Sequence, residues 1–285
     1  MRKSPGHGKN LSYYGFGRTT MFACQADQRF SYCLYVPDGY DEAGEETYPL
    51  AVIVHGTNRT AQEYRDAFAD FAEANRCIIL APLFPAGIVE PGELSSYKFI
   101  AFHDIRFDHL LLAMVDEIAA LYRIEPERFL LHGFSGGGHF AHRFYYLHPE
   151  RLLGVSIGAP GMVTLLDSEQ DWWVGVRDIE RLFGKAVDEA AMREVPVQMV
   201  IGGDDTDTWE ITVEPGGRYW MPGANDAGRT QLDRLRSLRE SFERAGIAVR
   251  HDIVAGVGHN GYAVLDPVNA IFAETLGAKR IGDGR

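Results

Sequence analysis

The fold of this chain is decided by residues 129–141, which read FLLHGFSGGGHFA. This stretch starts as a short apolar run typical of a buried strand, crosses a Gly-x-Ser-x-Gly motif and continues as a helical pattern. A serine at the apex of a tight turn between strand and helix predicts a nucleophile elbow at Ser135. Side chains at Gly133 or Gly137 would collide with the neighbouring strand or helix, which explains the flanking glycines. The helix that follows points its N-terminus at the serine, so the backbone N–H of Gly136 is expected to bind a developing oxyanion.

Outward from this stretch, apolar strand-like runs alternate with amphipathic helical patterns. Buried strands are expected at residues 49–54, 77–81, 152–157, 197–201 and 249–255. Helices are expected at residues 61–74, 107–122, 229–245 and 263–276. Residues 20–26 and 30–36 resemble an antiparallel pair at a sheet edge. The alternation of buried strands and helices predicts an α/β fold with a doubly wound, mostly parallel sheet.

The remaining segments predict how the chain is divided. Residues 1–18 are basic, glycine-rich and polar, and we expect a flexible N-terminal arm followed by a single domain over residues 19–285. Residues 84–104 contain several prolines and glycines and are expected to form a loop. Residues 162–194 and 206–228 lack strand periodicity and are expected to be cap-like excursions over the site.

The composition limits the partners of the chain. A formal net charge of −12 over 285 residues argues against nucleic acid and anionic membranes, because both favour basic surfaces. No apolar run approaches the roughly 20 residues that span a bilayer, and the N-terminus lacks the apolar core of a secretory signal. Cys24, Cys33 and Cys77 are scattered and suggest neither a disulfide framework nor a metal site. We therefore expect a cytoplasmic location, and no cofactor, since no dinucleotide fingerprint or phosphate-binding loop is present.

Two polar clusters follow the last two expected strands. Residues 202–207 (GGDDTD) follow strand 197–201, and residues 256–261 (GVGHNG) follow strand 249–255. In a parallel sheet, both clusters lie at the same edge as the elbow. A serine nucleophile needs a base, and the base needs a carboxylate that orients it. The order serine, carboxylate, histidine along the chain predicts His259 as the base.

Four points of the sequence together resemble the α/β-hydrolase superfamily. They are His55-Gly56-Thr57, the elbow Gly133–Gly137, the segment Gly202–Asp205, and Gly258-His259. The resemblance extends from about residue 20 to residue 276. Within the superfamily, the chain most resembles bacterial esterases of the polyhydroxybutyrate-depolymerase, feruloyl-esterase and dienelactone-hydrolase type, although dienelactone hydrolases carry cysteine as the nucleophile.

The resemblance implies a catalytic triad of Ser135, His259 and an aspartate. Members of the family place the aspartate three residues after a glycine that ends the strand, which indicates Asp205, with Asp207 and Asp204 as alternatives. Carboxylates at this spacing could also suit calcium, but the full calcium-loop signature is absent and no metal is expected.

The resemblance also implies how substrate is held. The oxyanion hole would combine the backbone N–H groups of Thr57 and Gly136. A histidine beside the elbow and tryptophans of the two excursions are candidates for the substrate pocket, namely His139, Trp172, Trp173, Trp209 and Trp220. The alternative for the tryptophans is that they pack the excursions onto the domain.

The activity implied is hydrolysis of a carboxylic ester through an acyl-enzyme intermediate, on a small-molecule or oligomeric ester. Cleavage of an amide or peptide and acyl transfer use the same triad and stay open at this stage. A non-catalytic ligand-binding protein on a hydrolase scaffold is the alternative of another class, and the presence of all three triad members argues against it. The sequence predicts no oligomeric state.

Overall fold

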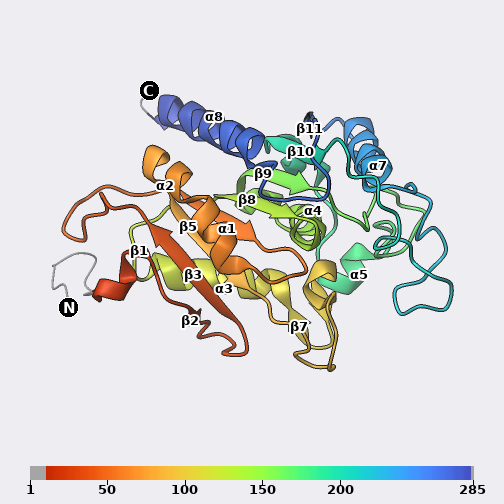
Figure 1. The fold of residues 1–285 in the computed structure, drawn as a ribbon, viewed down its shortest axis with the longest axis horizontal. Coiled ribbons are helices and arrows are strands. Elements are labelled where there is room, and N and C mark those ends of the chain that lie inside the picture. The colour runs from red at the N-terminus through yellow and green to blue at the C-terminus, as the bar shows by residue number, and fades with distance from the viewer. Residues whose placement is uncertain (1–10, 284–285) are drawn as a thin grey trace.

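One twisted sheet forms the centre of the molecule, and the computed structural model describes it within residues 11–283 (Figure 1). Its order is β1-β3-β5-β4-β8-β9-β10-β11, with β2 paired to β3. The strands are β1 (Gly17–Arg18), β2 (Phe22–Ala23), β3 (Ser31–Val36), β4 (Leu50–Val54), β5 (Ile78–Leu83), β8 (Phe129–Phe134), β9 (Leu152–Gly158), β10 (Val197–Gly202) and β11 (Val249–Val254). From β5 to β11 all neighbours are parallel, whereas β3 is antiparallel to its partners. The predicted doubly wound, mostly parallel sheet is confirmed.

Helices cover both faces of the sheet. One face carries α1 (Ala61–Ala67), α2 (Ala69–Asn75) and α8 (Leu265–Asp283), and the other carries α3 (Phe107–Ala119), α4 (Gly136–Leu147) and α7 (Gln231–Arg244). Phe71 of α2 contacts Phe272 of α8 with ring centres 6.1 Å apart, and Tyr145 of α4 contacts Phe242 of α7 at 5.7 Å. Every residue of α4 is buried, so any polar side chain on it needs an internal partner.

Three expected segments differ in detail from the structure. The helix expected over 61–74 is interrupted at Phe68, where α1 ends and α2 begins. The expected loop 84–104 contains a 3-10 helix, η2 (Ser96–Phe99), and meets a small hairpin of β6 (Ala101–Phe102) and β7 (Ile105–Arg106). Of the expected N-terminal arm, residues 1–10 lie outside the described residues, whereas η1 (Tyr13–Gly15) and β1 are ordered elements that lie against the domain.

The two excursions pack against each other and against η2. Residues 162–194 contain the short helices α5 (Ile179–Phe183) and α6 (Glu189–Arg193), and a further 3-10 turn, η3 (Pro149–Arg151), precedes β9. Trp173 of the first excursion donates its indole N–H to the Tyr219 carbonyl of the second at 3.0 Å. Phe99 of η2 stacks on the Tyr219 ring with centres 4.5 Å apart. The excursions and η2 therefore form a second, smaller apolar cluster beside the main core.

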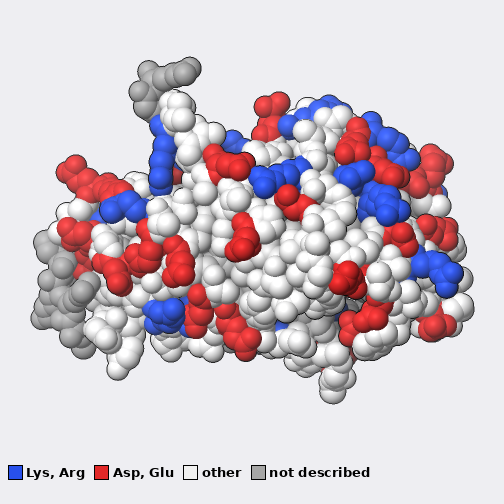
Figure 2. Space-filling view, turned by 45° about the horizontal axis from the view of Figure 1, so that its top comes forward, with Lys and Arg blue, Asp and Glu red and all other residues white. Residues whose placement is uncertain are grey.

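Two further features are the distribution of charged side chains on the surface and the length of the apolar helices. On the face drawn in Figure 2, acidic and basic side chains are intermixed. Among the helices of the described chain, none is long and apolar enough to cross a bilayer.

Candidate active site

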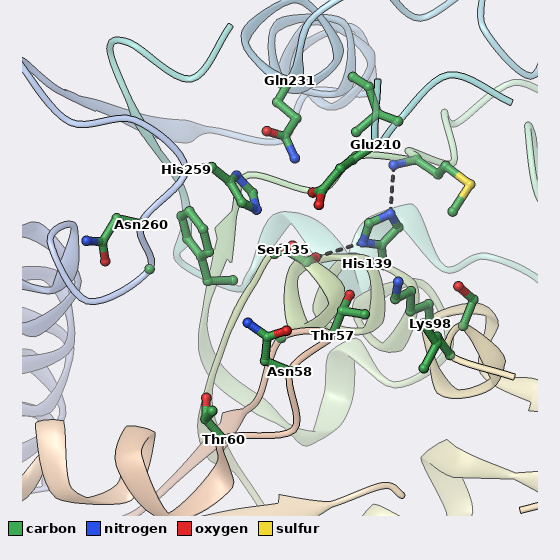
Figure 3. A pocket seen from close by; sticks show the side chains of 18 of the residues that line it. Thr57, Asn58, Thr60, Lys98, Ser135, His139, Glu210, Gln231, His259 and Asn260 are labelled. Atoms are coloured by element: carbon green, nitrogen blue, oxygen red, sulfur yellow. Dashed lines mark hydrogen bonds between the residues drawn. The ribbon is translucent and has the colours of Figure 1, made fainter. Parts of the chain in front are cut away.

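Ser135 lies on a strained turn between β8 and α4. Its φ of 56° and ψ of −114° place a residue with a side chain in a region that mainly glycine adopts. The turn is held by hydrogen bonds, because the Ser135 N–H donates to the Gly158 carbonyl at 2.8 Å and the His139 N–H donates to the Ser135 carbonyl at 3.0 Å. The strain is therefore maintained by the sheet and the first turn of α4, and the side chain faces the pocket (Figure 3).

The glycines of the elbow are required by close backbone approaches. A Cβ on Gly133 would lie 2.8 Å from the Gly137 Cα, and one on Gly137 would lie 3.0 Å from the His55 carbonyl oxygen. The first separation is shorter than real Cβ atoms show, and the second is tighter than most real Cβ contacts. The collision expected from the sequence at these two positions is therefore present in the structure.

His259 and Asp205 meet beside the elbow. Each follows a strand of the parallel pair β10–β11, and His259 Nδ1 lies 2.7 Å from Asp205 Oδ2. Asp205 is 1% exposed, whereas Asp204 and Asp207 are exposed. Of the three aspartates expected from the sequence, Asp205 is therefore the one whose carboxylate contacts His259.

Gln231 is a further member of this group, and no motif in the sequence singles it out. It is the first residue of α7, which begins after a capping box between Thr230 and Asp233. With its amide nitrogen turned toward the pair, Gln231 donates to Asp205 Oδ2 at 2.9 Å. The aromatic ring of Phe134 lies 5.0 Å from the ring of His259. Together these contacts fix the carboxylate and the imidazole.

The backbone segments expected to form an oxyanion hole face each other. A Cβ built on Gly136 would lie 3.1 Å from the Thr57 nitrogen. The loop that carries Thr57 is held by His55, whose Nδ1 donates to the Gly56 carbonyl at 2.8 Å and whose Nε2 accepts from the Phe84 N–H at 3.0 Å. Burial lowers the pKa of His55 to about 4, so this histidine is neutral near pH 7.

Two buried histidines of α4 tie the first excursion to the elbow helix. His139 Nδ1 lies 2.7 Å from the Ser135 carbonyl, and its Nε2 accepts from the Met162 N–H at 2.7 Å (Figure 3). One turn later, His142 makes the same pair of bonds to Gly138 and to Thr164. Burial holds the pKa of both histidines well below the usual range. Because both ring nitrogens of His139 are occupied, it lines the pocket as a neutral support and not as a proton carrier.

The pocket above Ser135 has a volume of about 820 Å³. Ser135, His259, Thr57, His139 and Trp209 all line it. The structure therefore brings together the expected nucleophile, the expected base and two of the five residues expected to contact substrate.

The other three tryptophans lie outside the pocket lining. Trp173 is 6% exposed and packs within the smaller apolar cluster, and Trp172 contacts the ring of Phe183 at 4.9 Å. Trp220 is partly exposed on the second excursion. The substrate contacts expected of these three side chains stay predictions, and the packing alternative describes the surroundings of Trp172 and Trp173.

The described chain offers little to a metal. No group of three or more His, Cys, Asp or Glu side chains between residues 11 and 283 is arranged to hold an ion. The three cysteines are buried and unpaired, and burial raises the pKa of Cys33 to about 11.

Known structures resemble this fold over most of the chain. Poly(aspartic acid) hydrolase-1 from Sphingomonas sp. KT-1 superposes with a TM-score of 0.73 and 21% identity, over 90% of this chain and 98% of its own. A poly(3-hydroxybutyrate) depolymerase from Bordetella parapertussis superposes with a TM-score of 0.66 and 25% identity, over 90% of this chain and 84% of its own. A fluorophosphonate-binding serine hydrolase of Staphylococcus aureus superposes with a TM-score of 0.58 and 11% identity, over 91% of this chain and 99% of its own. No family model and no curated protein matches the sequence.

The chain has the α/β-hydrolase fold. The structures it resembles are esterases and other hydrolases of this fold, in agreement with the resemblance drawn from the sequence.

Proposed function

We propose that the protein is a serine hydrolase that cleaves a carboxylic ester through an acyl-enzyme intermediate. The observation that carries the proposal is the 2.7 Å contact between His259 Nδ1 and Asp205 Oδ2 beside Ser135 on its strained turn. A buried carboxylate at this distance keeps the proton on Nδ1, which leaves Nε2 able to accept the serine proton.

The residues divide the reaction between them. Ser135 Oγ attacks the ester carbonyl carbon while His259 Nε2 takes the hydroxyl proton. The N–H groups of Thr57 and Gly136 donate to the oxyanion, and loss of one such donor costs about 3–4 kcal/mol. When the tetrahedral intermediate collapses, the departing alcohol receives the proton from His259 and the acyl group stays on Ser135. Water then attacks the acyl carbon and gives a proton to His259. Collapse of the second tetrahedral intermediate breaks the bond to Ser135 Oγ, which takes that proton back from His259, and the acid is released.

An amide substrate is the second candidate. The structural neighbour with a TM-score of 0.73 is named as a hydrolase of poly(aspartic acid), which is a polyamide, whereas the depolymerase acts on a polyester. The same triad serves both, because the pocket and the leaving group decide the preference. A panel of p-nitrophenyl esters with graded acyl chains, measured beside matched p-nitroanilides, tests the preference.

The cytoplasmic location stays a prediction, supported by the three buried, unpaired cysteines.

Replacement of the nucleophile tests the proposal. Ser135→Ala should retain less than about a hundredth of wild-type ester hydrolysis, because the members of a triad act as a unit. The melting temperature and far-UV circular dichroism of the variant should match the wild type, since alanine fits the same turn. Residual activity above that level in a folded variant would contradict the assignment and favour a ligand-binding protein with adventitious hydrolysis.

A further inference from the structure

Lys98 is a buried cation in the wall of the pocket. It belongs to η2, is 7% exposed and lines the same pocket as Ser135. Among the described residues, no carboxylate lies within ion-pair distance of its ammonium group and no side chain or carbonyl accepts a hydrogen bond from it. A buried charge without a partner is costly and is seldom kept without a use.

The residues around Lys98 make its surroundings more positive. Arg59 donates to the carbonyls of Thr57 and Leu94, and Arg143 donates to the Lys98 carbonyl itself. Neither guanidinium forms an ion pair with a carboxylate of the described chain. Three cations therefore gather on this side of the pocket without a paired carboxylate, although the chain as a whole has a net charge of −12, and Glu93 and Glu210 are the carboxylates whose charge acts on Lys98.

The position of Lys98 indicates which part of a substrate it meets. In Figure 3, His259 and Lys98 lie on opposite sides of Ser135, and the Lys98 side chain extends toward the pocket. The base must reach the departing oxygen, so the leaving group lies on the His259 side. The acyl part of the substrate then extends toward Lys98. The Lys98 Cε lies 3.1 Å from the position that a Cβ on Gly136 would occupy, so the cation is next to the oxyanion loop.

We propose that Lys98 binds a carboxylate carried by the acyl part of the substrate, so that the enzyme prefers monoesters of dicarboxylic acids and other anionic acyl groups. This inference rests on the proposed serine-hydrolase function and assigns its substrate class. One charged hydrogen bond of this kind contributes selectivity of roughly 10- to 100-fold.

Glu210 of the second excursion is the residue whose carboxylate could compete with a substrate carboxylate for Lys98. Its carboxylate lines the pocket and points inward in Figure 3, yet it forms no ion pair with Lys98. A substrate carboxylate would approach Lys98 against the repulsion of Glu210. Removal of the Glu210 charge should therefore improve the use of anionic substrates, whereas a Glu210 that serves as the structural partner of Lys98 would give the opposite result.

The direct test compares two esters that differ by one charge. Mono-p-nitrophenyl adipate carries a free carboxylate, and its methyl ester is a neutral analogue with the same acyl chain; the pimelate and suberate pairs extend the reach. For wild type, kcat/KM should favour the anionic member of at least one pair. Lys98→Met should lower kcat/KM for that anionic ester by about 10- to 100-fold and leave the neutral ester within about threefold, while Lys98→Arg should restore part of the preference.

Controls separate this effect from overall charge and from folding. Lys185→Met removes the same charge at an exposed lysine that pairs with Glu150, and the preference should not change. Lys98→Met should melt at or above the wild-type temperature, because it removes a desolvated charge. Glu210→Gln should raise kcat/KM for the anionic ester by about threefold or more through loss of repulsion.

Each other outcome overturns a stated part of the account. Equal losses on both esters in Lys98→Met would assign Lys98 to the oxyanion and contradict the carboxylate subsite. A wild type that hydrolyses neutral esters with no anionic preference would refute the subsite and leave the serine hydrolase standing. Hydrolysis of neither ester, with Ser135→Ala indistinguishable from wild type, would refute both.

The pH dependence gives an independent readout. Burial, together with the charges of Arg59 and Arg143, lowers the pKa of Lys98 to about 8, and the carboxylates of Glu93 and Glu210 oppose this shift. Lys98 is charged below this pH, so the ratio of kcat/KM for the anionic ester over the neutral ester should fall as pH rises from 7 to 9. The ratio cancels the titration of the catalytic base. A ratio that is flat across this range in wild type would contradict the role of the ammonium charge.

Discussion

The two halves of the site are built by different physical means. The half that carries Ser135 and His259 is positioned by strand ends of a parallel sheet and by close backbone contacts that exclude a Cβ. The half formed by the excursions is held to α4 by side chains, through His139 to Met162 and through His142 to Thr164. The first half is therefore specified by short local motifs. The second depends on neutral, buried histidines and is expected to respond to pH.

The largest expected effect concerns the sheet half. Asp205→Asn should lower kcat by about 10⁴, by analogy with the serine-protease triad, because the amide favours the wrong histidine tautomer. Asp204→Asn and Asp207→Asn serve as matched controls, since both carboxylates are exposed, and they should stay within about threefold of wild type. The measurement is kcat on a p-nitrophenyl ester. An inactive Asp207→Asn variant together with an active Asp205→Asn variant would show that Asp207, and not Asp205, is the acid of the triad.

The next effect concerns stability in acid. Burial lowers the pKa of His55 to about 4 and also holds the pKa values of His132, His139 and His142 below the usual value of 6.5. Below pH 6.5 these histidines bind protons in the unfolded chain but stay neutral in the folded chain. The free energy of unfolding is therefore highest above pH 6.5 and decreases as the pH falls toward 4. Each such histidine contributes a slope of about 1.4 kcal/mol per pH unit.

The acid response should also separate the two halves. All four tryptophans lie in the excursions, so tryptophan fluorescence reports on that half, whereas far-UV circular dichroism reports mainly on the sheet and its helices. Acidification should change the fluorescence at a higher pH than the circular dichroism, because protonation of His139 and His142 breaks the bonds to Met162 and Thr164, whereas the strands of the sheet are joined by backbone hydrogen bonds that do not titrate. Coincident transitions would show that the halves unfold as one unit.

A smaller effect is expected at Gln231, which contacts the His259–Asp205 pair from the wall of the pocket. Gln231→Leu should lower kcat by about tenfold with KM unchanged, since a hydrogen bond to a buried carboxylate is lost. Gln231→Glu should lower it further, because it adds a second carboxylate next to Asp205. A change confined to KM would instead indicate that Gln231 acts on substrate binding.

The smallest effects distinguish a tryptophan that lines the pocket from a tryptophan that packs in the smaller apolar cluster. Trp209 lines the pocket and is 74% exposed, so Trp209→Ala should raise KM for long acyl esters by about fourfold and leave the melting temperature unchanged. Trp173→Ala should lower the melting temperature by several degrees with the ratio of long-chain to short-chain kcat/KM unchanged, because the indole is buried in the smaller cluster. The reverse pattern would place Trp173 in the pocket.

The sequence allowed the sheet half to be predicted because its chemistry sits at strand ends. Ser135 and His259 each follow a recognisable strand, and Gly133 and Gly137 indicate a turn with close backbone approaches. The other parts of the site could not be predicted in the same way. Lys98 and Gln231 reach the site from segments whose local sequence resembles an ordinary loop and an ordinary amphipathic helix. Trp173 and Trp209 look alike in sequence, and long-range packing alone decides which one faces the pocket.

Labelling by a fluorophosphonate tests the central claim most directly. Wild type should react at one equivalent, peptide mass spectrometry should locate the adduct on Ser135, and His259→Ala should react much more slowly because the serine loses its base. No adduct on the folded wild type, or an adduct on a residue other than Ser135, would contradict the account.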